Sequence, residues 1–207
     1  MKVRIAVIHY SSTGNVYRLA QALAQGASDR GAEVRLRRVP ELAPPEAIAQ
    51  NPKWAAHLQQ MAEENKAPLA SMEDLSWADG IALGSPTRFG GPAAQLKNFL
   101  DQTGGLWAKG LLADKVVTAF TSSSTAHGGL ESTILATLNL AYHWGAVIVP
   151  LGYTSDIVTK ITGNPYGASW VSRKGASPDA DALAAAGAQG ARLARISAAI
   201  AAARAVP

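Results

Sequence analysis

Short apolar runs alternate along this chain with longer segments in which apolar residues are spaced as on one face of a helix. Residues 2–10 form an apolar, β-branched run that is too short for a helix and precedes small polar residues, which predicts a buried strand. The next segment predicts a helix that ends at Gly31, because its apolar residues recur every three or four positions. These residues are Val16, Leu19, Ala20, Leu23 and Ala27.

The same alternation continues to the end of the chain. Four further apolar runs predict strands at residues 32–39, 78–86, 115–120 and 146–150. Residues 40–76 contain several prolines and no regular period, which indicates a loop with short helices. Three helices are predicted from sets of spaced apolar residues, namely Leu96, Phe99 and Leu100, then Ile134, Leu138 and Ala141, then Leu193, Ile196 and Ile200.

Strands that alternate with helices, each strand nearly all apolar, predict a doubly wound α/β fold. We expect its five-stranded parallel sheet to be covered by helices on both faces, which makes a three-layer sandwich. The chain is long enough for one full core, so we expect a single domain over residues 1–207 with an insertion around 40–76. In such a sheet the ligand site lies beyond the carboxyl ends of the strands.

Composition narrows the chemistry that this fold can carry. Apolar residues make up 48% of the chain and charged residues 16%, as in ordinary globular proteins, and there is no cysteine. Disulfides, thiol redox chemistry and cysteine-zinc sites are therefore excluded, and any redox reaction needs a cofactor. No two histidines have the spacing of metal ligands with a carboxylate partner, so we expect no metal site.

The net charge of +4 allows an anionic partner, but the basic residues are scattered. Only residues 35–38 form a basic cluster, which we interpret as the solvated face of one strand. We therefore expect no nucleic-acid partner. No stretch approaches the roughly eighteen apolar residues of a membrane span, so we expect no membrane insertion and a cytoplasmic protein.

Three polar loops are predicted at the same edge of the sheet, at residues 11–16, 85–91 and 121–129. The first loop opens a helix, so its backbone N–H groups and the positive end of the helix dipole converge on one point, with the hydroxyls of Ser11, Ser12 and Thr13 beside them. This arrangement predicts an anion site. The loop lacks both a lysine and a G-x-G-x-x-G pattern, which favours a single phosphate. The alternative interpretation is a Ser/Thr cap on an ordinary helix.

Two of these loops resemble segments of known protein families. The first contains SSTGN, which resembles the FMN phosphate loop of flavodoxins. The second begins the stretch GSPTRFGGPAAQLKNFLDQTGGLW, which resembles the WrbA family of NAD(P)H:quinone oxidoreductases. This second likeness continues through KVVTAF, WGAVIVPLGY and NPYGAS to about residue 170.

The resemblance implies a flavodoxin-like fold that binds FMN. It places the phosphate in a loop made of Ser11, Ser12, Thr13, Gly14, Asn15 and Val16. It places the flavin ring between two segments, one with Pro86, Thr87, Arg88, Phe89 and Gly90, the other with Ser122, Ser123, Ser124, Thr125, Ala126, His127 and Gly128. Arg88 would bring a positive charge near the ring, and Phe89 would form a wall of the ring site. The alternative for Arg88 is a pair with a surface carboxylate, and without the resemblance an arginine in a loop is most often solvated.

Two further residues match the family pattern, and the chain departs from that pattern in two places. His143 matches a flavin-site histidine, although a histidine on a last helical turn often caps or packs the helix. Trp107 matches a residue over the substrate pocket, in a segment whose two glycines predict a loop, although a tryptophan is often core. Thr13 stands near the nicotinamide, where the family usually has an aromatic residue. The segment SSSTAHGG, with His127, replaces the family's glycine-rich loop.

The activity that the resemblance implies is the reduction of a quinone by NADH or NADPH through FMN, in a homotetramer with sites at the subunit contacts. We would look for these contacts in the 40–76 insertion and the GGLW segment. A flavodoxin-type electron carrier is the first alternative, although carriers that dock basic redox partners are expected to be acidic. A scaffold protein that has lost its cofactor is the second. The sequence does not distinguish NADH from NADPH.

Overall fold

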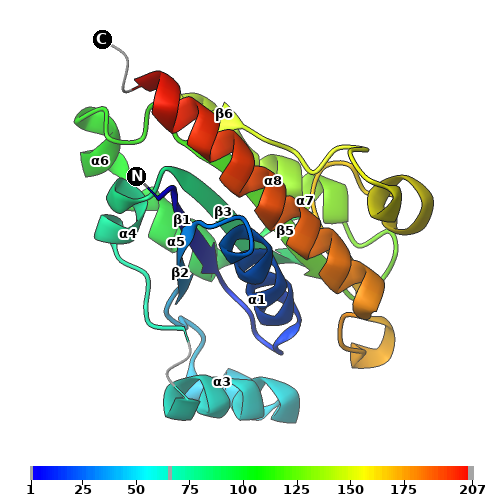
Figure 1. The fold of residues 1–207 in the computed structure, drawn as a ribbon. Coiled ribbons are helices and arrows are strands. Elements are labelled where there is room, and N and C mark those ends of the chain that lie inside the picture. Colours follow the sequence, from blue (N-terminus) through cyan, green and yellow to red (C-terminus); the bar gives the residue numbers. More distant parts are fainter. Residues whose placement is uncertain (1, 65–66, 205–207) are drawn as a thin grey trace.

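The computed structural model describes residues 2–64 and 67–204, and Figure 1 shows them as a ribbon. Residues 65 and 66 of the expected insertion lie outside the described residues. The strands are β1 (Arg4–His9), β2 (Glu33–Arg38), β3 (Gly80–Arg88), β4 (Gly91–Pro92), β5 (Val116–Ser123), β6 (Val147–Ile148) and β7 (Ser169–Val171). The α-helices are α1 (Asn15–Ser28), α2 (Pro45–Ala49), α3 (Pro52–Glu64), α4 (Met72–Trp77), α5 (Ala94–Asp101), α6 (Gly104–Ala108), α7 (Leu130–Trp144) and α8 (Ala180–Arg204). A π-helical turn η1 (Ile157–Thr162) and a 3-10 turn η2 (Arg173–Gly175) lie between β6 and α8.

The central sheet has the strand order β2-β1-β3-β5-β6, and these five strands are parallel. This confirms the predicted doubly wound parallel sheet. Two short strands extend it at one end: β7 pairs in parallel with the last residues of β5, and β4 pairs antiparallel with the end of β3. The carboxyl ends of β3 and β5 are therefore held by more partners than the core order alone supplies.

Alternating side chains on the strands divide the core into two layers. Ile5 and Val7 of β1 face α1 and α8, whereas the neighbouring Ile8 packs on the other face with Leu96 of α5 and Ile134 of α7. Figure 1 shows α1 and α8 lying together across one face of the sheet. Helices on both faces confirm the three-layer sandwich. No helix in the described part of the chain is long and apolar enough to cross a membrane.

Several expected boundaries were wrong. β3 runs on to Arg88 and β5 to Ser123, because pairing between Pro86 and Ser122 continues beyond the apolar run. Conversely, β6 is shorter than the predicted strand 146–150. The segment around Trp107, expected to be a loop, is the short helix α6. Thr103 accepts backbone hydrogen bonds from Leu106 and Trp107, which closes this helical turn despite its two glycines.

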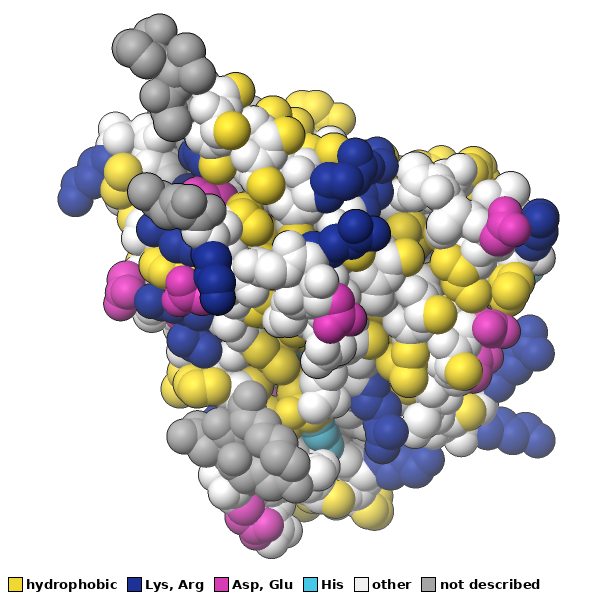
Figure 2. Space-filling model, in the orientation of Figure 1, with side chains coloured by type: hydrophobic (Ala, Val, Ile, Leu, Met, Phe, Trp, Pro, Cys, Tyr) yellow, Lys and Arg dark blue, Asp and Glu magenta, His cyan; other side chains and the backbone are white. Residues whose placement is uncertain are grey.

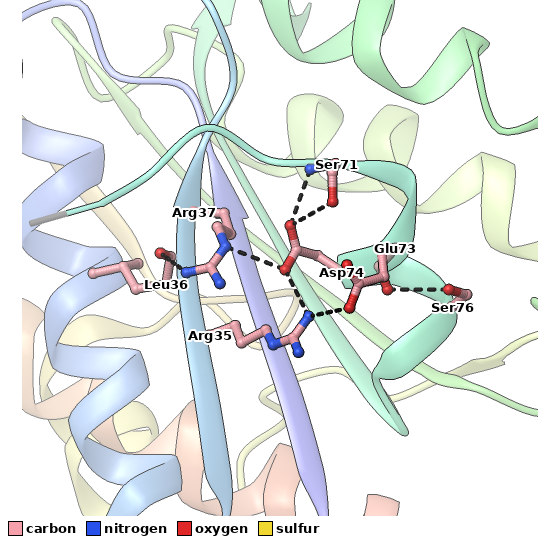
Figure 3. Close-up of polar contacts among 7 residues, drawn as sticks. All are labelled: Arg35, Leu36, Arg37, Ser71, Glu73, Asp74 and Ser76. Carbon is pink, nitrogen blue, oxygen red and sulfur yellow. Dashed lines mark hydrogen bonds and ion pairs between the residues drawn. The ribbon is translucent and has the colours of Figure 1, made fainter. Parts of the chain in front are cut away.

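The basic cluster at residues 35–38 is not a solvated strand face. Arg35 and Arg37 of β2 both reach Asp74 of α4, at 3.2 and 3.1 Å, and Figure 3 shows the two guanidinium groups converging on that carboxylate. Arg35 also lies 4.1 Å from the ring centre of Trp77. The sequence pattern missed this pairing because the partners are on a helix almost forty positions further along.

Asp74 is the most connected carboxylate of this cluster. Its side chain is 4% exposed and also accepts hydrogen bonds from the backbone N–H and the hydroxyl of Ser71. Burial alone would raise the pKa of Asp74, but the Ser71 N–H and the charges of Arg37 and Arg35 outweigh burial and hold it below the ordinary value. The ionised carboxylate therefore stabilises the folded state.

Replacing Asp74 by Asn should lower the free energy of unfolding at pH 7 by about 2–4 kcal/mol, because two partly buried arginines lose their partner. The folded-state pKa is depressed, so the wild-type contribution is complete above the ordinary value of 3.8 and is lost as pH falls through the folded-state value. Urea unfolding at neutral and acidic pH measures both effects. The exposed Asp101, paired with Lys97, supplies the control Asp101→Asn, for which little change is expected. An Asp74→Asn defect that is the same at every pH would contradict this account.

Candidate functional site

The three predicted loops meet at the carboxyl edge of the sheet. β1 and β3 are in register at His9 and Gly84, so the first two loops leave the sheet side by side. The Nη2 of Arg88 donates to the Oγ of Ser12 at 3.3 Å, which joins the second loop to the first. The Oγ1 of Thr87 donates to the carbonyl of Gly128 at 3.0 Å, which joins the second loop to the third. One contiguous surface results from three segments far apart in the sequence.

The first loop ends in an open helix N-terminus. Gly14, at φ 92°, is the residue that precedes α1, and no side chain among the described residues caps the helix. The Oγ of Ser11 accepts a hydrogen bond from the N–H of Gly14 at 3.1 Å, one residue before the helix begins. The alternative interpretation as an ordinary Ser/Thr cap is therefore wrong.

The residues of this loop fit a phosphate. The first-turn amides of a helix without a side-chain cap converge with the positive end of the helix dipole, and the first turn of α1 carries no acidic residue. Asn15 and Val16 are buried, which anchors the start of α1, whereas Thr13 is exposed at the loop tip. The loop is thus rigid at its base and open at its tip.

Arg88 brings a cation to the same loop. Its Nη1 donates to the carbonyl of Thr87 at 2.9 Å while its Nη2 contacts Ser12, so both bonds direct the guanidinium back over the first loop. No ion pair joins it to a carboxylate in the described part of the chain. These bonds place its charge beside the first loop, and the expected position near a flavin ring stays a prediction.

The second segment makes a tight, projecting turn between β3 and β4. Phe89 has φ 53°, an uncommon conformation for a residue other than glycine, and its side chain is fully exposed. Thr87 holds the turn, because its Oγ1 accepts hydrogen bonds from the N–H of Gly90 and from the hydroxyl of Thr133. Pro86 is still paired with β5. A large aromatic side chain held outward in this way has a flat face available to a ligand ring.

The third segment begins inside β5 and only then becomes a loop. Ser122 and Ser123 are buried strand residues, and the Oγ of Ser123 donates to the carbonyl of Thr125 at 2.6 Å to close the following turn. The N–H of Gly128 donates to the same carbonyl at 3.1 Å. The four residues between Ser123 and Gly128 are exposed, namely Ser124, Thr125, Ala126 and His127.

Two matched residues are not brought to this surface within one chain. The helices α5 and α7 both begin at the carboxyl edge of the sheet and end at the opposite edge. Trp107 lies on α6, which follows α5, and His143 lies on the last turn of α7. Gly110, three residues after Trp107, lines a cavity with Val3 and Lys115, which precede β1 and β5. Figure 1 shows α6 at the end of the molecule where the chain begins. Trp107 is 58% exposed, so it is not a core residue, and His143 is exposed.

Sequence reasoning missed a ring stack beneath the first loop. His9 at the end of β1 stacks on Tyr17 of α1 with ring centres 5.4 Å apart, and Tyr17 in turn lies 5.8 Å from the ring of His57 on α3. Burial lowers the pKa of His9 to about 3, although its hydrogen bond to the backbone of Arg37 opposes that shift. His9 is therefore neutral at physiological pH. Single aromatic residues in three separate elements carry no local signal that could have revealed this stack.

Glu41 attaches the insertion to the same edge. It accepts hydrogen bonds from the hydroxyl of Tyr10 at 2.8 Å, from the Nε1 of Trp54 at 2.9 Å and from the Nε2 of Gln95 at 2.6 Å. Tyr10 directly precedes the first loop, so this carboxylate links the insertion, β1 and α5. Burial, and then Glu41 itself, raise the pKa of Tyr10, which stays protonated as the donor.

In the described part of the chain, no group of three or more His, Asp or Glu side chains is placed to hold a metal ion. What this edge offers a ligand is an uncapped helix N-terminus, an exposed phenyl ring and one arginine. Redox chemistry would come from a bound organic group, since the chain contains no cysteine.

Comparison with known proteins gives matches over most of the chain. The family described as NADPH-dependent FMN reductase matches residues 3–157. A NAD(P)H dehydrogenase (quinone) of Deinococcus radiodurans is 45% identical over 167 residues, which cover 81% of this chain and 82% of that protein. A protein with the same name from Paracoccus denitrificans is 43% identical over 208 residues, with coverages of 97% and 96%. Among solved structures, a flavodoxin, WrbA-like protein from Agrobacterium tumefaciens matches with a TM-score of 0.63 and 22% identity, over 96% of this chain and 99% of its own.

Proposed function

Because this chain belongs to the NADPH-dependent FMN reductase family, we propose that it is an FMN-dependent NAD(P)H:quinone oxidoreductase. The observation that carries the proposal is the convergence of three loops on an uncapped helix N-terminus at the carboxyl edge of the sheet. Relatives more than 40% identical over four fifths of the chain or more are named for this activity.

The residues at the site divide the work of holding FMN. The first loop, from Ser11 to Val16, binds the phosphate with its backbone N–H groups and hydroxyls, and Arg88 adds a charge-assisted contact. The two ring segments, 86–90 and 122–128, bind the flavin ring, with Phe89 as one wall. Bound FMN would supply the redox chemistry, in which the hydride of NAD(P)H and one proton from water together convert a quinone to a hydroquinone.

No general acid or base is required from the chain. His9 is buried and neutral. The histidine in the ring segments is His127, and its side chain is exposed. The protein groups orient the flavin and the two substrates, and the exposed Thr13 lies beside the path of the pyridine nucleotide. A cytoplasmic location, where NADH and NADPH are available, is part of the proposal.

The absorbance spectrum of the purified protein tests this function. A flavin spectrum that bleaches on anaerobic addition of NADPH and returns on addition of benzoquinone is the expected result. The alternative is a flavodoxin-type electron carrier, which would carry flavin but oxidise almost no NADPH or NADH with benzoquinone in steady state. The basic net charge favours the enzyme over an acidic carrier.

The assembly proposed for this enzyme is a homotetramer. Within one chain, Trp107 and His143 lie at the edge of the sheet opposite the three loops. They reach a flavin only if a second subunit places its own Trp107 and His143 against the three loops of the first. The exposed side chains of Leu135 and Tyr142 on the outer face of α7 provide apolar area for such contacts. Sedimentation equilibrium measures the oligomeric state.

Replacing Trp107 by Ala should lower kcat/KM for benzoquinone by about tenfold, because an indole over the substrate contributes roughly 1–2 kcal/mol of stacking and apolar contact. FMN content and the rate of flavin reduction should stay unchanged. Stopped-flow measurement of the two half-reactions separates these effects. Replacing Leu111, which is exposed near the same edge, by Ala is the control. An unchanged quinone half-reaction in the tetrameric Trp107→Ala variant would contradict the proposed role.

A further inference from the structure

A cavity of about 470 Å³ opens beside the phosphate loop, between α1 and α3. One wall consists of Gly14, Tyr17 and Arg18, and the other of Lys53 and His57, with the turn at Gly175 and Ser177 along the rim. We call this cavity the α1–α3 pocket. Figure 2 shows a histidine side chain set back in the surface, with Lys and Arg side chains to one side of it. The volume is in the range of sites that bind small molecules.

The α1–α3 pocket is cationic. Its charged or titratable lining groups among the described residues are Arg18, Lys53, His57 and the phenol of Tyr17, and none of its described lining residues is a carboxylate. Arg18 makes no ion pair with any described residue. Burial lowers the pKa of His57, and the positive charges of Arg18 and Arg38 lower it further. Unpaired cations facing a cavity favour an anionic ligand.

Lys53 is the second cation of the pocket, and a hydrogen bond holds it in position. Its Nζ donates to the carbonyl of Gly175 at 3.2 Å, which fixes the ammonium at the rim and leaves its other hydrogens free to bind a ligand. This bond joins α3, which belongs to the insertion, to the turn before α8. The insertion therefore contributes a wall and a cation to a pocket that the phosphate loop also lines.

The position of the pocket limits what the anion is. It shares Thr13, Gly14 and Asn15 with the phosphate loop, but its lining includes no residue of the ring segments 86–90 and 122–128. A flavin mononucleotide ends at the phosphate loop and has no further anionic group. A longer ligand that stacks on the flavin ring and passes the exposed Thr13 would place its other end in this pocket.

A pyridine dinucleotide is such a ligand, and its two forms differ in one group. A carboxylate at the adenosine ribose typically binds the 2′-hydroxyl of NADH, whereas an arginine accommodates the 2′-phosphate of NADPH. The pocket offers an arginine and a lysine without a carboxylate among its described lining residues. We propose that the α1–α3 pocket binds the adenosine 2′-phosphate of NADPH through Arg18 and Lys53, so that the enzyme prefers NADPH to NADH. This inference rests on the proposed function.

Steady-state kinetics with saturating benzoquinone test the preference. In the variants Arg18→Gln and Lys53→Gln, kcat/KM for NADPH should fall about tenfold to a hundredfold, as expected for one charge-assisted hydrogen bond, while kcat/KM for NADH is unchanged. Arg30 lies past the other end of α1 and is exposed, so Arg30→Gln makes the same change of charge away from the pocket and should leave both values unchanged. Equal losses for NADH and NADPH would overturn the proposal.

Two further measurements distinguish the possible failures. FMN content should equal that of the wild type in every variant, and a loss of FMN in Arg18→Gln would assign the pocket to the flavin phosphate and overturn the inference. Calorimetry on the FMN-loaded protein should show adenosine 2′,5′-bisphosphate binding at least tenfold more tightly than 5′-AMP, with the difference abolished in Arg18→Gln. This binding test does not depend on turnover, so absent quinone reduction would count against the proposed function alone.

Discussion

Replacing Gly14 by Leu should abolish the retention of FMN through purification, with an affinity loss of at least about a hundredfold, or roughly 3 kcal/mol. Gly14 has φ 92°, a backbone angle that residues other than glycine rarely adopt, and it directly precedes α1. A Cβ built there would lie 3.4 Å from the Nδ1 of His57, so a larger side chain pushes the loop and α3 apart. The loop amides would then no longer converge on a phosphate.

The control for this experiment is Gly31→Leu, after the other end of α1. Gly31 has φ 80°, and a Cβ there would meet nothing within 4 Å. Both variants therefore carry a similar backbone strain of about 1–2 kcal/mol, but only one changes the site. Flavin absorbance per protein and the thermal unfolding midpoint should be measured for both. If Gly14→Leu retained FMN at the wild-type ratio, the loop would not be the phosphate site.

Replacing Gly190 by Ala should lower the free energy of unfolding by at least about 2 kcal/mol, although alanine is the better helix former. Gly190 lies in α8 where that helix crosses α1, and a Cβ there would sit 1.9 Å from the carbonyl oxygen of Leu23. The obstacle is backbone in the middle of a buried helix, so it cannot rotate away. The two helices would have to separate, and with them the apolar layer that they bury against the sheet.

Gly187→Ala, one turn earlier in the same helix, is the matched control. A Cβ at that position would lie 3.7 Å from the carbonyl oxygen of Ala22, an ordinary contact. The expected result is an unchanged or slightly higher stability, because glycine in a helix costs about 1 kcal/mol relative to alanine. Urea unfolding of the two variants gives the comparison directly. Equal stability of Gly190→Ala and Gly187→Ala would show that the close approach of α1 and α8 does not limit stability.

Elements whose formation depends on residues close together in the sequence were predictable from the sequence. The apolar run of β1, the spaced apolar residues of α1 and the small polar residues between them are local signals, and the structure has strand, loop and helix there. The alternation of five such strands with helices was enough for the parallel, doubly wound sheet. The three polar loops at one edge followed from this topology, the family resemblance assigned FMN to them, and the structure brings them together. The single domain over the whole chain stays a prediction.

Other features were decided only by packing between distant parts of the chain. The ends of β3 and β5 depend on pairing between strands, and the short α6 forms where two glycines predicted a loop. The ion pairs that cover Arg35 and Arg37 come from α4. None of these features is coded by the residues immediately around it.

The site shows the same division. The phosphate loop is made of adjacent residues, so its chemistry could be proposed from its sequence alone. The place of Trp107 at the opposite edge follows from the length and direction of the helix before it, and the α1–α3 pocket exists only because α3 and the turn at Gly175 pack against α1. Periodicity records what lies within a few residues of a position. Which surfaces meet is determined by the burial of apolar area across the whole sheet, and this depends on all the elements together.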